Sequence, residues 1–169
     1  MKLEIREFLT KHRGIDFMVD YLSSQPEEVA SVLEFAAHAD DPDAWRGAWI
    51  LNHFITEEHP DLVTLHPKLI AALLDAKDGH QRELLRLLEK VTVHEDEEGK
   101  LFDACIAIWT DLKKSGSARI TAFRVAASFL KVYPELAAEL RPLTTSEYTV
   151  NLTPGIRNSF QKLVSRSSL

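Results

Sequence analysis

Four arginines recur along this chain at nearly constant intervals, and their spacing limits the possible folds more than any other feature. Arg46, Arg82, Arg119 and Arg157 are separated by 36, 37 and 38 residues. A fixed period of this length is typical of stacked helical or helix-and-strand units, each of which buries its apolar face against the next. The spacing therefore predicts a repeat protein built from units of one shape.

The residues before the first three arginines repeat as well. Thirteen positions before them stand Leu33, Leu69 and Ile106, and we expect these three side chains to be buried at equivalent places in their repeats. The fourth copy is preceded by a longer polar connection, as is common in a terminal repeat. Each full unit therefore consists of a helix, a short turn and a second helix.

Helical periodicity runs through the chain, and alternating strand patterns are almost absent. Leu, Ala, Glu, Lys and Arg, which are good helix formers, are abundant. Proline and glycine mostly fall between the amphipathic stretches, where helices are expected to end. The predicted helices cover 2–12, 15–24, 26–39, 42–57, 60–75, 79–92, 96–114, 117–132, 134–141 and 154–167, with a less regular stretch at 142–153.

These patterns together predict an all-α fold, a right-handed α-α superhelix of about four to five helix pairs. We expect residues 1–169 to form a single domain, with an N-terminal helix pair in 1–25 and four repeats in 26–169, the last one irregular.

Composition excludes several classes of function. The net charge is −6, and the resulting field opposes the approach of nucleic acid, so a nucleic-acid partner is disfavoured. Cys105 is the only cysteine, which excludes an intramolecular disulfide and paired-cysteine zinc sites. The charged N-terminus and the lack of a long apolar run predict a cytoplasmic protein without a membrane span. We expect no cofactor and no metal, because His53, His59 and His66 are spaced by six and seven residues, and a helical metal pair needs three or four.

The period, together with a polar turn before an arginine early in the second helix, resembles HEAT and armadillo-type repeats over about residues 26–167. This resemblance implies a HEAT-like solenoid. The chain also looks like a group of small bacterial proteins of this architecture, some of which carry an adenylosuccinate lyase label. That lyase family uses a Gly/Ser-rich loop with a catalytic serine, and this sequence has no such loop, so we discount the activity.

Candidate binding residues lie mainly on the predicted second helices. The arginines would either grip an acidic ligand or form a ladder between repeats, bonded to carboxylates and carbonyls in the turns. Trp45 lies off the apolar stripe and is the best candidate for an exposed aromatic anchor. The proposed face includes Trp45, Arg46, His53, Arg82, Arg86 and Arg119.

No catalytic motif is present, since the sequence has neither a phosphate-binding glycine loop nor a nucleophile elbow. The leading prediction is a non-enzymatic scaffold that binds a protein or peptide. The alternative is a nucleic-acid-binding relative of the HEAT-like DNA alkylation repair proteins, which bind a damaged nucleotide in a cleft of aromatic residues, aspartate and arginine. Trp45 and Trp49, with Arg46 between them, loosely resemble that lining.

Overall fold

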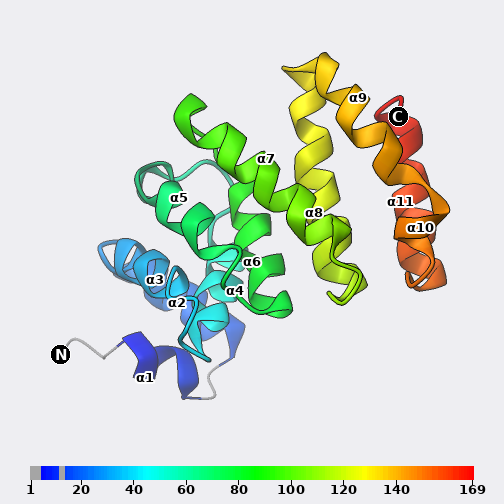
Figure 1. Ribbon diagram of the computed structural model, residues 1–169. Coiled ribbons are helices and arrows are strands. Elements are labelled where there is room, and N and C mark those ends of the chain that lie inside the picture. The colour runs from blue at the N-terminus through cyan, green and yellow to red at the C-terminus, as the bar shows by residue number, and fades with distance from the viewer. Residues whose placement is uncertain (1–4, 12–13) are drawn as a thin grey trace. The chain divides into compact units, whose positions relative to one another are not determined.

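The computed structural model describes residues 5–11 and 14–169, and every regular element within these ranges is a helix (Figure 1). The prediction of an all-α repeat fold is therefore confirmed. By its internal contacts the chain divides into two compact units, residues 1–97 and residues 98–169. Among the described residues, no helix is long and apolar enough to cross a bilayer.

The first unit is a two-layered stack of helix pairs. In one layer α3 packs against α1 and α5, and in the other α4 packs against α2 and α6. The layers are joined by contacts between α3 and α4 and between α5 and α6. The helices are α1 (Ile5–Thr10), α2 (Ile15–Ser24), α3 (Glu28–Ala36), α4 (Ala44–Phe54), α5 (Pro60–Ala72) and α6 (Asp78–Leu88).

The second unit contains most of α7, then one more full helix, an irregular connection and the last long helix. The connection between residues 129 and 153 is made of short turns of helix. The sequence predicts an irregular stretch only over 142–153, and the helices predicted over 117–132 and 134–141 end earlier or are shorter than expected. The elements are α7 (Glu95–Thr110), α8 (Gly116–Ser128), η1 (Phe129–Lys131), η2 (Pro134–Leu136), α9 (Ala137–Leu140), η3 (Arg141–Thr144), α10 (Ser146–Thr149) and α11 (Pro154–Arg166).

Local sequence signals fix where several helices start. The Ser115 hydroxyl accepts a hydrogen bond from the Ala118 amide at the start of α8, at 3.3 Å. Thr153 caps α11 in the same way, and Pro154 follows it at the first helical position, where its missing N–H costs nothing. These caps satisfy amide groups that have no carbonyl partner within the helix.

The predicted equivalence of Leu33, Leu69 and Ile106 holds in the first unit and fails in the second. Leu33 and Leu69 are fully buried, which confirms the prediction for those two positions. Ile106 is only half-buried, so the prediction of equal burial was wrong there. Cys105 and Trp109 are fully buried, and Ile106 lies at the edge of the apolar stripe of α7.

A buried histidine joins α6 to α3, and its burial should make stability depend on pH. His80 is 5% exposed, and its Nε2 atom lies 2.7 Å from the Ala36 carbonyl oxygen, to which a neutral ring donates. Burial lowers the pKa of His80 below its ordinary value of 6.5, and the bond to Ala36 opposes this shift. In the unfolded chain His80 therefore takes up a proton near pH 6.5, whereas in the folded protein it does so only at a lower pH.

From this we expect the stability contributed by His80 to be complete above about pH 6.5 and to decline as the pH falls below that value. One proton changes the free energy of unfolding by at most about 1.4 kcal/mol per pH unit. Urea denaturation between pH 7.5 and 5 should show a shallower pH dependence for His80→Gln than for the wild-type protein. Equal slopes for the two proteins would contradict this assignment.

Candidate functional site

Two neighbouring helices of the first unit present polar and aromatic side chains in rows with helical spacing. On α4 the row has an interval of four residues, as does the row on α6, which continues just past the end of that helix. Residues at this interval lie above one another on one face of a helix. The two rows, together with Arg46, are called the α4–α6 surface. It consists of Trp45, Arg46, Trp49 and His53 from α4, Arg82 and Arg86 from α6, and Lys90 just after α6.

A buried carboxylate holds the two arginines of this surface. The side chain of Glu83 is 1% exposed, while those of Arg82 and Arg86 are each 43% exposed. Glu83 Oε1 accepts hydrogen bonds from Arg82 Nε at 3.0 Å and Nη2 at 2.8 Å. Glu83 Oε2 lies 3.2 Å from Arg86 Nη1 and 3.0 Å from Asn52 Nδ2, which connects the cluster to α4. The outer faces of both guanidinium groups remain exposed to solvent.

Lys90 extends the cationic row and bonds to the C-terminal end of α4. Its Nζ atom donates to the carbonyl oxygens of Asn52 and Ile55, at 2.6 and 2.7 Å. A cation near a helix C-terminus interacts favourably with the helix dipole. Burial lowers the pKa of Lys90, and the nearby charge of Arg86 lowers it further, against the opposite effects of Glu83 and Glu89. Part of this row is thus committed to holding α4 and α6 together.

The aromatic row is partly exposed to solvent. Trp45 is 39% exposed, and the Arg46 guanidinium lies 5.1 Å from the centroid of its ring. Arg46 also lies near Asp43, with 3.9 Å between Nε and the carboxylate oxygen. Trp49 is half-buried and packs edge-on against the exposed ring of His53, with 5.2 Å between the centroids. The structure therefore brings Trp45, Arg46 and His53 to the surface along one helix.

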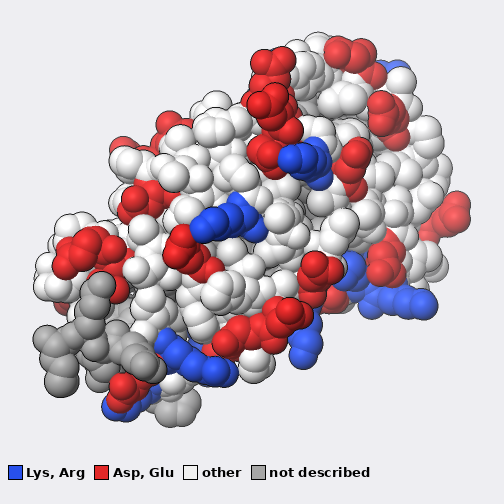
Figure 2. All heavy atoms as spheres, turned by 60° about the vertical axis from the view of Figure 1, so that its left-hand side comes forward, with Lys and Arg blue, Asp and Glu red and all other residues white. Residues whose placement is uncertain are grey.

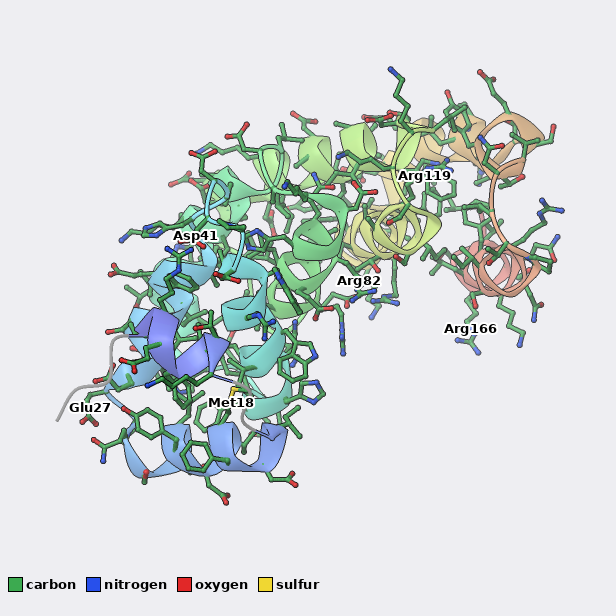
Figure 3. All side chains as sticks on the ribbon, turned by 90° about the horizontal axis from the view of Figure 1, so that it is seen from below. Met18, Glu27, Asp41, Arg82, Arg119 and Arg166 are labelled. Carbon is green, nitrogen blue, oxygen red and sulfur yellow. The ribbon has the colours of Figure 1, made fainter. Side chains whose placement is uncertain are left out.

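Arg119, which the sequence places in the same row of arginines, has a different position. It belongs to the second unit and is 1% exposed, and Figure 3 shows it among packed helices, in contrast to Arg82. Its Nε donates to the Trp109 carbonyl at 2.8 Å and its Nη2 to the Tyr148 carbonyl at 2.6 Å. Burial lowers the pKa of Arg119, an effect that Asp111 opposes. We therefore leave Arg119 out of the candidate surface.

The charges around the candidate surface are mixed. Residues 1–97 contain ten Lys and Arg against twenty Asp and Glu. On the face drawn in Figure 2, acidic side chains are interspersed with separate basic ones, and the described residues there form no continuous basic stripe. No group of three or more His, Cys, Asp and Glu among the described residues is arranged to hold a metal ion.

The sequence interpretation missed the structural role of Glu83. The structure places this residue inside the unit as the group that binds Arg82, Arg86 and Asn52. A signal was available, because Glu83 lies three positions after His80 and four before Leu87, both of which are buried on α6. A carboxylate on the buried side of a helix requires cationic partners close by.

Comparison with known proteins gives one match. A family model described as a HEAT repeat domain matches residues 5–166, nearly the whole chain. No curated protein and no solved structure matches the chain.

Proposed function

This chain belongs to the HEAT repeat domain family, and we propose that it is a non-enzymatic scaffold that binds a protein or peptide partner on its α4–α6 surface. The observation that carries the proposal is the pairing of an accessible aromatic row on α4 with a cationic row on α6. Tryptophan and arginine are the residues that most often dominate the energy of protein interfaces. Stacked helical repeats supply a rigid support for such a surface.

The geometry favours a partner segment that carries carboxylates. Glu83 fixes Arg82 and Arg86 with their outer faces in solvent, so each has donors directed away from Glu83. Arg82 and Arg86 lie on adjacent turns of α6, which are about 5.4 Å apart along the helix axis. Alternate residues of an extended partner segment are about 6.6 Å apart, so two alternate acidic side chains of the partner can reach both arginines. An apolar side chain of the same segment would cover Trp45.

Nucleic acid is a weaker candidate for this surface. The cations of α6 are partly neutralised by Glu83, and the unit as a whole carries twice as many acidic as basic residues. Screening confines each favourable contact to about 8 Å at physiological salt, so a polyanion would need a dense basic face. We therefore expect no measurable binding of duplex DNA by the first unit's surface.

The proposal can be tested by selecting peptides from a random display library on the folded protein and measuring their affinities by calorimetry. We expect selected peptides to contain two alternate acidic residues and one large apolar residue. Trp45→Ala and Arg86→Ala should each weaken binding by about tenfold or more. The matched controls are Leu74→Ala and Lys68→Ala, exposed residues of the same unit that lie outside the surface, and these should bind normally.

Two results would contradict the proposed function. One is that the control variants lose affinity as much as the surface variants do. The other is that no peptide is selected, while duplex DNA binds with an affinity that falls steeply as salt is added and that depends on Arg82 and Arg86.

A further inference from the structure

Two packed helices of the second unit carry cations and no carboxylate. The sequences of α8 and α11 contain Arg119, Arg124, Arg157, Lys162 and Arg166, with no Asp or Glu in either helix. Residues 98–169 hold ten Lys and Arg against six Asp and Glu, although the chain as a whole is acidic. Positive charge is therefore concentrated in this unit, and within it on this pair of helices.

Three of these cations surround one small groove between α8 and α11. Arg119 and Arg157 bond to main-chain carbonyls elsewhere and do not line it. The groove has a volume of about 210 Å³, and its lining combines two apolar residues, three cations and a hydroxyl: Ile120, Arg124, Ser159, Lys162, Leu163 and Arg166.

The groove is held by a well-packed frame. Phe160, one residue from Ser159 on α11, is 3% exposed and stacks on Trp109 with 4.8 Å between ring centroids. At the other end, α11 approaches α8 so closely that a Cβ atom on Gly116 would lie 3.0 Å from Ile156. Helix positions fixed in this way reduce the entropy lost when a ligand is bound.

The arrangement of the cations has an electrostatic cost. Lys162 and Arg166 are one turn apart on α11, and like charges at this spacing destabilise a helix. The presence of Arg166 is explained by its position in the last turn of α11, where a cation interacts favourably with the helix dipole. Figure 3 shows Arg166 pointing outward. A position in the last turn does not account for Lys162. A bound anion would offset the repulsion within the groove.

We propose that this groove binds the phosphate group of a small ligand. Arginine and lysine donate charge-assisted hydrogen bonds to phosphate oxygens, and Arg124, Lys162 and Arg166 supply such donors from two sides. The volume equals roughly seven water molecules, which suits one phosphate or pyrophosphate group and the start of the attached molecule. The apolar floor formed by Ile120 and Leu163 would contact that attached part.

The test is an NMR titration of the ¹⁵N-labelled full chain with inorganic phosphate and with pyrophosphate, at constant ionic strength. We expect saturable shifts in amide signals of α8 and α11 around the groove, with pyrophosphate binding more tightly than phosphate. The variant Lys162→Glu/Arg166→Glu should weaken pyrophosphate binding by about tenfold or more, since it removes two charge-assisted contacts. The variant Lys131→Glu/Arg141→Glu, with the same change of charge on the same unit, should bind like the wild type.

Three outcomes would overturn the proposal. Shifts that spread over all basic residues without saturation would indicate simple screening, and equal loss of binding in both double variants would indicate a general effect of charge. Duplex DNA binding through Lys162 and Arg166 more tightly than pyrophosphate at the same salt would assign the groove to nucleic acid instead. The wild-type titration decides the question even if a variant fails to fold. None of these residues belongs to the α4–α6 surface, so the result is independent of the proposed scaffold function.

Discussion

Replacement of Trp109 by alanine is expected to lower the free energy of unfolding by about 3–5 kcal/mol, the cost typical of removing a large buried aromatic side chain. The indole is fully buried, and its ring packs against Phe123 and Phe160, with 4.8 Å between centroids in each case. Its Nε1 donates to the Leu143 carbonyl at 3.0 Å, and the Arg119 guanidinium lies 4.8 Å from the ring centroid. The substitution would leave a cavity, an unbonded carbonyl and a buried cation without its aromatic partner.

The matched control is the same substitution at Trp45, which is 39% exposed. Trp45→Ala should cost about 1 kcal/mol, well below the loss at Trp109, because more than a third of the residue's surface stays in contact with water in the folded protein. Guanidinium denaturation followed by far-ultraviolet circular dichroism measures both, since the signal does not depend on the removed indole. Similar losses for the two variants would show that Trp109 does not hold the second unit together.

The architecture could be predicted from the sequence because each repeat contacts only the repeats next to it. The nearly constant spacing of Arg46, Arg82 and Arg119 reflects units of nearly equal length. Such units bury their apolar stripes by packing on one another. The prediction was wrong at Ile106, because the spacing fixes the length of a repeat and not how much of each helix surface its neighbours cover. Successive side chains of a helix point about 100° apart, so Cys105 can be fully buried while Ile106 lies at the edge of the core.

The candidate surface was less predictable for a related reason. Helical spacing predicts that Arg82 and Arg86 share a face, and the structure agrees. It does not say which residue of the neighbouring helix faces them, and the contact between Glu83 and Asn52 depends on how α4 and α6 dock. The repeat spacing predicts the same role for Arg119 and Arg82, yet Arg119 is buried and Arg82 is half-exposed, a distinction that depends on the packing around each.

The two arginines that pair with Glu83 should contribute to stability cooperatively. Arg82→Ala and Arg86→Ala should each cost about 1 kcal/mol, because each guanidinium is partly exposed and the second one still pairs with the carboxylate. The double variant should cost about 3 kcal/mol, more than the sum of the two. The double variant leaves the Glu83 carboxylate, which is 1% exposed, with the Asn52 amide as its donor. A buried charge without a cationic partner lowers the free energy of unfolding strongly.

Adding Glu83→Leu to the double variant should restore much of the lost stability, because the buried charge is then gone and an apolar side chain fills its place. Urea denaturation of the single, double and triple variants gives the coupling energy directly. Strictly additive losses, or a triple variant less stable than the double, would show that the arginines do not neutralise Glu83. If the predicted order is found, the triple variant keeps its fold but lacks both arginines, and its loss of peptide binding would then be attributable to the surface and not to unfolding.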